Sequence, residues 1–321
     1  MKLIDQSQVK TIAVIGVGLI GAGWTAWFLS RGFAVRASDA DPKREAFLRN
    51  FVKEAWPLLK NLGMVANADP SRLTFHADPA EAARGADFVQ ENVFERLDLK
   101  QDVLAAVDAV LLPDRIIASS TSSYPPSDLQ IKCKHAERVL VGHPFNPPHL
   151  IPLVEVVGGK KTDPAAVDWS MAFYDGIGKK AIRLRKEIVG HYVNRVQEAV
   201  FREMVHCVAE GIVSVEDADI GIAYGPGLRW AFMGPAFTYH MAGGPGGLAY
   251  SFDHFGPDME KNWADLGNPK LTPELMKTFI EGTKAETGGK SYAELAGWRD
   301  RCLVAIQNAL DQEAAAKKSS R

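Results

Sequence analysis

Residues 11–21 have the sequence TIAVIGVGLIG, an apolar run followed by a glycine pattern. The run predicts a buried strand, and residues 22–31 predict a helix directly after it. In this strand–turn–helix setting, Gly16 allows a tight turn, Gly18 lets a pyrophosphate approach the backbone, and Gly21 lets the helix pack on the strand. The stretch therefore predicts a dinucleotide-binding turn, with a glycine turn without ligand as the alternative. The predicted cofactor contacts are Gly16, Val17, Gly18, Leu19, Ile20 and Gly21.

A carboxylate follows the second predicted strand, residues 34–39. This residue, Asp39, lies 18 residues beyond Gly21. At this position a carboxylate binds the ribose hydroxyls of NAD and repels the 2′-phosphate of NADP. We therefore predict NAD as the cofactor. Arg36 and Arg44 are close in sequence and leave NADP open.

The first half of the chain alternates strand-like and helix-like segments. A helical stretch after Pro42 extends to about residue 62, and short apolar runs lie near Leu73, Phe88 and Ile116. This alternation predicts an α/β domain whose mostly parallel sheet has helices on both faces. We predict that this domain spans residues 1–188.

Residues 189–321 have a different pattern, which predicts an all-helical second domain. Apolar residues recur at spacings of three and four in the first predicted helix, residues 190–211. Further helices are predicted at 215–223, 235–242, 273–286 and 292–310. The glycine- and proline-rich segment 225–247 resembles a shaped loop more than a linker.

Composition excludes several classes of protein. A hydrophobic fraction of 46% and a net charge of −2 are ordinary for a globular protein and give no reason to expect nucleic acid or a membrane as partner. The three cysteines form no CxxC or zinc pattern, so we expect free thiols and no metal centre. With no signal-peptide pattern at the N-terminus, we expect a cytoplasmic protein.

A histidine and a carboxylate stand out in residues 141–159, VGHPFNPPHLIPLVEVVGG. His143 and Glu155 are twelve residues apart, with four prolines between them that keep the backbone extended. The flanking runs predict two short strands, so the two side chains could meet across a cleft. A carboxylate that orients an imidazole makes a general base. A structural pair is the alternative.

These motifs in this order resemble the 3-hydroxyacyl-CoA dehydrogenase superfamily. They are the glycine turn, the serine-rich SSTSS of residues 119–123, HPFNP followed by LVEVV, and YVNR of residues 192–195. The resemblance covers nearly the whole chain. It implies a Rossmann-like domain, a helical domain that dimerises, and hydride transfer between NAD and a secondary alcohol.

The resemblance also implies roles for individual residues. His143 would be the base, with Glu155 orienting it, and Ser122 and Asn194 would bind the substrate oxygen. Further cofactor contacts would come from Glu95, Lys100 and Asn146. The alternatives are that Ser122 serves only the turn, that Asn194 makes a local hydrogen bond, and that Lys100 is a solvated charge on a helix.

Acyl-CoA members of the superfamily place a serine and a lysine on the helix after the second strand, where this chain has Ala55 and Leu62. Pro57 is expected to interrupt that helix. His191 follows Gly190 where the family often has phenylalanine. These departures argue against CoA and favour a small free hydroxy acid.

The segment at residues 224–244 resembles the corresponding region of the L-carnitine 3-dehydrogenases, as does FDHFGP at 252–257. Carnitine ends in a trimethylammonium group, which proteins bind with aromatic faces, and Arg229 could clamp its carboxylate. For the residues, the alternatives are a core role for the aromatic side chains and an internal ion pair for Arg229. For the protein, the alternatives are a gulonate 3-dehydrogenase or lambda-crystallin relative, an acyl-CoA enzyme, and a non-catalytic NAD-binding protein. The aromatic candidates are Tyr224, Trp230, Phe232, Phe237, Tyr239 and Phe252.

Overall fold

The computed structural model describes residues 1–319 and divides the chain into two compact units. The first unit is Met1–Asn194 and the second is Arg195–Arg321. The first is built around a sheet and the described part of the second is helical. Each is described below by itself.

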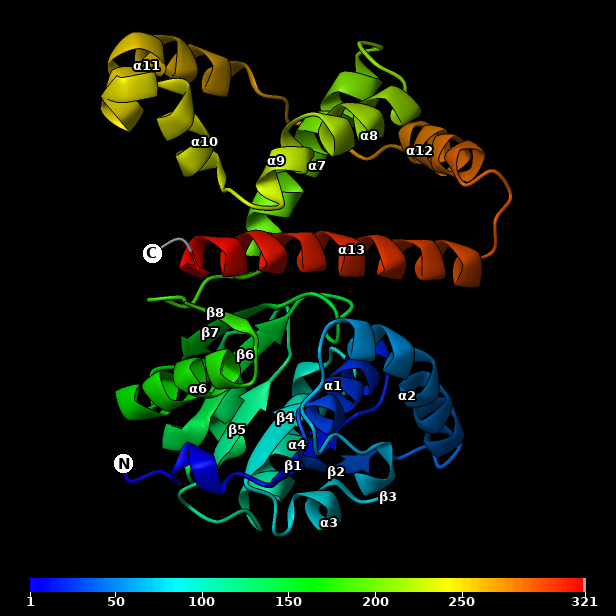
Figure 1. Ribbon diagram of the computed structural model, residues 1–321, viewed down its shortest axis with the longest axis vertical. Coiled ribbons are helices and arrows are strands. Elements are labelled where there is room, and N and C mark those ends of the chain that lie inside the picture. The colour runs from blue at the N-terminus through cyan, green and yellow to red at the C-terminus, as the bar shows by residue number, and fades with distance from the viewer. Residues whose placement is uncertain (320–321) are drawn as a thin grey trace. The chain divides into compact units, whose positions relative to one another are not determined.

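The first unit contains an eight-stranded sheet in the order β3-β2-β1-β4-β5-β6-β7-β8 (Figure 1). Every neighbouring pair is parallel except β6 and β7, which are antiparallel. The order reverses between β1 and β4, and open α/β sheets bind ligands at such a switch point. The strands are β1 Thr11–Ile15, β2 Ala34–Ser38, β3 Leu73–His76, β4 Phe88–Glu91, β5 Ile116–Ser119, β6 Val139–Pro144, β7 Leu153–Gly158 and β8 Lys180–Arg183.

Helices cover both faces of the sheet, as expected for parallel strands. Alternate residues of β1 point to opposite faces, so Ile12 and Val14 join one apolar core while Ala13 and Ile15 join the other. The first core packs against α1 Leu19–Ser30, α2 Arg44–Asn61 and α6 Pro164–Gly176. The second packs against α3 Pro79–Ala83, α4 Leu97–Asp108 and α5 Pro126–Leu129. The predicted Rossmann-like architecture is confirmed.

Two details of the first unit differ from prediction. Pro57 lies inside α2, and the helix continues through it to Asn61. A proline removes one N–H donor, and burial of Val52, Ala55 and Leu59 on the same helix offsets that loss. Strand β8 was not predicted, because its residues are partly or fully exposed and form no apolar run.

The described part of the second unit is helical. Its helices are α7 Val193–Ala209, which begins in the first unit, α8 Val215–Tyr224, α9 Pro226–Trp230, α10 Pro235–Ala242, α11 Gly247–Asp265, α12 Pro273–Glu286 and α13 Tyr292–Ser319. Within this unit α8 packs on α9 and α12, and α10 packs on α11. No helix of the described chain is long and apolar enough to cross a membrane.

Within the segment 225–247, expected to be a shaped loop, the helix predicted at 235–242 is confirmed as α10, and α9 was not predicted. Helices α9 and α10 occupy much of this segment, each with a proline at its start, where the missing N–H costs nothing. Helix α11 was also missed because Gly256 and Pro257 interrupt its pattern, yet it is continuous over 19 residues. Helix α13 continues nine residues beyond the predicted end at 310.

Candidate active site

The glycine turn joins β1 to α1 at the switch point of the sheet. Gly16 has a φ of 83°, and a Cβ there would meet the backbone of Asn92 at 2.7 Å. A Cβ on Gly21 would lie 1.9 Å from the Gly16 carbonyl oxygen. Around Gly18 a Cβ would meet nothing within 4 Å. Two glycines therefore allow close packing of the turn, and the third leaves its backbone open to a ligand.

Asp39 lies beside this turn, immediately after β2. Its carboxylate accepts a hydrogen bond from the Val17 N–H at 3.0 Å. A pocket of about 250 Å³ opens here between the ends of the strands. The pocket is lined by Gly16, Gly18, Asp39, Arg44, Asn92, Val93 and Phe94, among others. The turn, a carboxylate and an apolar wall thus form one cleft at the β1/β4 switch point.

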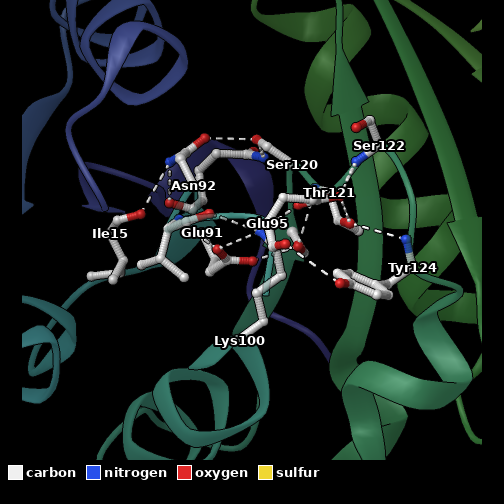
Figure 2. Close-up of polar contacts among 12 residues, drawn as sticks. Ile15, Glu91, Asn92, Glu95, Lys100, Ser120, Thr121, Ser122 and Tyr124 are labelled. Atoms are coloured by element: carbon white, nitrogen blue, oxygen red, sulfur yellow. Dashed lines mark hydrogen bonds and ion pairs between the residues drawn. The ribbon is translucent and has the colours of Figure 1, made fainter. Parts of the chain in front are cut away.

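A buried ion pair lies next to that cleft (Figure 2). The Lys100 ammonium lies 3.0 Å from Glu91 Oε1 and 3.2 Å from Glu95 Oε2, and it donates to the Val93 carbonyl at 3.0 Å. Lys100 is 1% exposed, so the reading of this side chain as a solvated helix charge is wrong. The structure shows the ammonium binding the chain itself.

Glu95 holds the serine-rich turn that follows β5 (Figure 2). Its Oε1 accepts hydrogen bonds from the Thr121 hydroxyl at 2.5 Å, the Ser122 N–H at 3.0 Å and the Ser123 N–H at 2.9 Å. Partial burial raises the pKa of Glu95, but the hydrogen bond from Thr121 and the charge of Lys100 outweigh it, so the pKa lies below its ordinary value. Glu95 is therefore ionised at neutral pH and fixes the turn that carries Ser122.

His143 and Glu155 face each other on β6 and β7. They are directly opposite in the antiparallel register, and His143 Nδ1 lies 2.9 Å from Glu155 Oε2. His143 is 5% exposed and Glu155 is fully buried. Because a carboxylate only accepts, Nδ1 carries the hydrogen and Nε2 of the neutral ring keeps a lone pair. This is the arrangement in which an imidazole acts as a base.

The second oxygen of Glu155 binds the backbone at the start of α7. Oε1 accepts from the Tyr192 N–H at 3.0 Å and the Val193 N–H at 2.9 Å. Burial raises the pKa of Glu155, but the hydrogen bonds from His143 and Val193 outweigh it, and the pKa is lowered. Since Asn194 follows Val193 directly, this carboxylate also places Asn194 at the same end of the sheet.

His191 contacts both His143 and the serine-rich turn. It is 1% exposed, its ring centroid lies 4.9 Å from that of His143, and Nε2 lies 2.9 Å from the Thr121 carbonyl oxygen. The phenyl ring of Phe145 makes an edge contact with the His143 ring, with their centroids 4.9 Å apart. One imidazole, that of His191, and one phenyl ring, that of Phe145, thus contact the ring of the proposed base.

The contacts of Glu155 and His191 connect the segments that carry the four candidate catalytic residues, which are Ser122, His143, Glu155 and Asn194. Asn146 follows His143 on the connection to β7 and is exposed. The four candidates for substrate contacts lie in the second unit, all exposed, and are Arg229, Trp230, Phe232 and Tyr239. Also exposed are the aromatic side chains of Tyr224, Phe237 and Phe252. The alternative of a core role for these aromatic residues is therefore wrong for the described structure.

Three residues of the site were missed at the sequence level. Glu91 and Thr121 form the network around Glu95, and His191 contacts both His143 and the serine turn. Their signals were weak. Glu91 ends an apolar strand, and His191 was noted only as a departure from phenylalanine.

The site combines a dinucleotide cleft with an imidazole–carboxylate pair, and together these define an NAD-dependent dehydrogenase. Among the residues that the structure describes, no group of three or more histidine, cysteine and carboxylate side chains could hold a metal ion. An imidazole with a free Nε2 lone pair can accept the proton of an alcohol, and NAD accepts hydride.

Comparison with known proteins shows the family. Residues 11–188 match the family model of the 3-hydroxyacyl-CoA dehydrogenase NAD binding domain, and residues 190–292 match that of its C-terminal domain. The chain belongs to the 3-hydroxyacyl-CoA dehydrogenase family.

Relatives with near full-length similarity carry one name. The L-carnitine dehydrogenase of Nocardiopsis dassonvillei is 47% identical over 98% of this chain and 95% of its own. That of Pseudomonas aeruginosa is 43% identical over 95% of each chain. Among solved structures, FHMPC 5-dehydrogenase, an NAD+ dependent dismutase, has a TM-score of 0.82 at 30% identity and covers 95% of this chain and 99% of its own.

The residues of the cleft fit NAD, the cofactor that the family implies. The open space at Gly18 accepts a pyrophosphate, and the first N–H groups of α1, which have no partner within the helix, favour its charge. The Asp39 carboxylate can accept from the ribose hydroxyls.

Proposed function

We propose that this chain oxidises the 3-hydroxyl of L-carnitine to 3-dehydrocarnitine with NAD as the hydride acceptor. The observation that carries the chemical step is the His143–Glu155 pair on β6 and β7, in the same sheet as the dinucleotide cleft. The substrate follows from the L-carnitine dehydrogenases with which the chain shares nearly its whole length.

His143 is the base in this proposal. Its Nδ1–H is held by ionised Glu155, so Nε2 is free to take the hydroxyl proton. The positive charge that then forms on the ring is stabilised by Glu155, whose pKa is lowered in the folded protein. NAD, when bound, takes the hydride from the carbon that carries the hydroxyl.

Ser122 and Asn194 are the proposed donors to the substrate oxygen. The Ser122 N–H is bound to Glu95, and no hydrogen bond among the described residues occupies the Ser122 hydroxyl or the Asn194 amide. Glu95, Lys100 and Asn146 support the cofactor side, the first two by fixing the serine turn. Donors aimed at the oxygen stabilise the negative charge that develops as the proton leaves.

We assign substrate recognition to the second unit. Arg229 is exposed and takes part in no ion pair among the described residues, so its guanidinium is available to a carboxylate. Exposed Trp230, Phe232 and Tyr239 offer ring faces to a quaternary ammonium, each worth ~0.5–2 kcal/mol. On α2, Ala55 is buried and cannot serve a CoA phosphate.

We further propose a homodimer through the helical domain, residues 189–321, with residues 1–188 as the NAD-binding domain. Large apolar side chains remain exposed on the helical unit, among them Trp263, Ile280 and Trp298. A second copy of the chain would cover such a surface. The free cysteines fit a reducing compartment such as the cytoplasm.

A substrate panel followed by nicotinamide absorbance tests the function. We expect NADH formation from L-carnitine and none from D-carnitine. Turnover of L-gulonate without turnover of L-carnitine would transfer the assignment to a sugar-acid dehydrogenase, and activity on acetoacetyl-CoA with NADH would restore the acyl-CoA assignment. Tight NADH binding without turnover of any substrate would indicate a non-catalytic NAD-binding protein.

Arg229→Ala and Arg229→Lys test the substrate pocket in the same assay. We expect Arg229→Ala to raise KM for L-carnitine by about tenfold or more, because a bidentate partner of the carboxylate is lost. Arg229→Lys keeps the charge and should lose less, while KM for NAD stays unchanged in both. An unchanged KM for L-carnitine in Arg229→Ala would remove Arg229 from the pocket.

A further inference from the structure

His191 has an unusual backbone conformation. Its φ of 52° makes it the one non-glycine residue with a positive φ in the described chain, and it follows Gly190, which has a φ of 74°. This left-handed region is sparsely populated by residues with a Cβ. Such a conformation persists when surrounding contacts require it, and it occurs often at functional sites.

The two ring nitrogens of His191 are used unequally. Because the Thr121 carbonyl can only accept, Nε2 carries the hydrogen of the 2.9 Å contact. In the neutral ring Nδ1 then has a lone pair, and this buried atom has no hydrogen-bond partner among the described residues. An unpaired buried nitrogen is a cost that a phenyl ring of similar size would avoid. What the imidazole provides and a phenyl ring would lack is the Nε2–H that binds the Thr121 carbonyl.

The backbone of His191 reaches the base from another direction. The two N–H groups that follow it, those of Tyr192 and Val193, both donate to Glu155. Consecutive N–H groups after a left-handed residue commonly form such an anion-binding concavity. One residue thus joins the carboxylate, through its backbone, to the serine turn, through its side chain.

The ring of His191 also contacts the base. The two imidazole centroids are 4.9 Å apart, with an angle of 40° between the rings. Burial lowers the pKa of His191, and the neighbouring His143 acts in the same direction. The ring is therefore neutral beside the imidazole that must become charged.

We propose that His191 is a positioning residue, which holds the Ser122 turn in register with His143 and the start of α7 through the Nε2–H···O=C contact to Thr121. This proposal rests on the proposed function for its kinetic consequences. Its contacts join segments that are 70 residues apart in sequence, and they define the distance between the oxygen donor Ser122 and the base.

Three substitutions separate the hydrogen bond from ring packing and backbone strain. His191→Phe keeps a ring against His143 and loses the donor. His191→Asn tolerates the positive φ and is too short to reach Thr121. His191→Gln supplies an N–H donor of nearly the right length. We expect kcat to fall about 10- to 100-fold in the Phe and Asn variants, because small displacements of reacting groups have effects of this size, with partial rescue by Gln.

The affinity for NADH and the KM for NAD should stay within about twofold of the wild type in all three variants, since His191 does not line the dinucleotide pocket. A purely structural role predicts a lower melting temperature with an unchanged kcat per folded enzyme. That result, or a Phe variant as active as the wild type, would overturn the proposal.

A measurement without substrate keeps the test independent of the reaction. In the protein labelled with ¹⁵N-histidine, NMR should show one imidazole with a slowly exchanging Nε2–H and an unprotonated Nδ1, and His191→Phe should remove this signal. If L-carnitine is not oxidised but this signal is present, the proposed function fails and the positioning contact between His191 and Thr121 stands. If the signal is absent from the wild type, the proposed contact between His191 and Thr121 fails, whatever the activity.

Discussion

Glu155 and His143 are register partners on antiparallel strands, and their side chains meet at 2.9 Å between Oε2 and Nδ1. Residues directly opposite in an antiparallel pair project to the same face, so the pairing of β6 with β7 itself sets this distance. The contact is therefore as rigid as the central sheet.

His143→Ala should abolish most of the oxidation of L-carnitine, with kcat lower by about 10²–10⁴-fold, the usual contribution of a general base. NADH binding, measured by fluorescence titration, should be nearly unchanged because His143 lies outside the dinucleotide pocket. His135→Ala, at a histidine paired with Glu137 elsewhere on the unit, is the matched control and should keep wild-type rates. Near-normal turnover in His143→Ala would show that another group is the base.

Glu155→Gln should lower kcat by at least about 100-fold. The amide has no charge to stabilise the imidazolium, and it can present an N–H to Nδ1, which favours the wrong tautomer of His143. Steady-state kinetics with saturating NAD measures this effect. A kcat within about threefold of the wild type would mean that Glu155 serves only the fold, through the N–H groups of Tyr192 and Val193.

The lowered pKa of Glu155 predicts a pH dependence of stability. In the unfolded chain the carboxyl titrates near its ordinary value of about 4.3, so the unfolded state binds the proton first as pH falls. The stabilisation is thus fully present above that pH and is lost as pH falls through the folded-state pKa. Between about pH 5 and pH 3, the free energy of unfolding should fall more steeply in the wild type than in Glu155→Gln. Urea denaturation at a series of pH values measures both slopes, and equal slopes would contradict the assignment.

Two glycines of the nucleotide turn should respond differently to alanine. Gly21→Ala places a Cβ 1.9 Å from the Gly16 oxygen, so the helix must move and we expect a loss of about 1–3 kcal/mol of stability or more. Gly18→Ala meets nothing within 4 Å, so the protein should fold normally. Its Cβ would occupy the space of the pyrophosphate, and NADH affinity should fall about tenfold or more. Thermal unfolding and NADH titration distinguish the two variants, and unchanged NADH affinity in Gly18→Ala would move the pyrophosphate elsewhere.

Asp39→Ser should weaken the preference for NAD over NADP. The serine can still accept one hydrogen bond, but the charge that repels a 2′-phosphate is gone, and Arg44 lines the same pocket. Removing a like-charge contact changes discrimination by about 100-fold. The ratio of kcat/KM for the two cofactors is the measurement. A ratio equal to that of the wild type would show that Asp39 does not meet the adenosine ribose.

Several features were predictable because local rules decide them. A strand, a glycine turn and a helix in succession specify their own geometry, so Gly16, Gly18 and Gly21 could be assigned from spacing alone. The pair His143 and Glu155 could be expected to meet because prolines exclude a helix between two short strands. Its participation in catalysis stays a prediction that the variants above address.

Other features were not predictable from local patterns. Helix α2 continues through Pro57 and α11 through Pro257, because a single lost hydrogen bond is small beside the contacts of a whole helix. Likewise, an exposed four-residue strand such as β8 has no apolar run, and only its pairing with β7 makes it a strand.

The amino-acid sequence by itself determined the nucleotide turn, the parallel sheet and the residue types of the reacting pair, since each depends on neighbours within a few positions. The tertiary structure decided which side chains support that pair. Lys100 is a buried ion-pair partner of Glu91 and Glu95, and His191 reaches Thr121 across 70 residues. Such contacts arise when chain segments far apart in sequence are packed together, and burial makes each unpaired polar atom costly enough to select its partner.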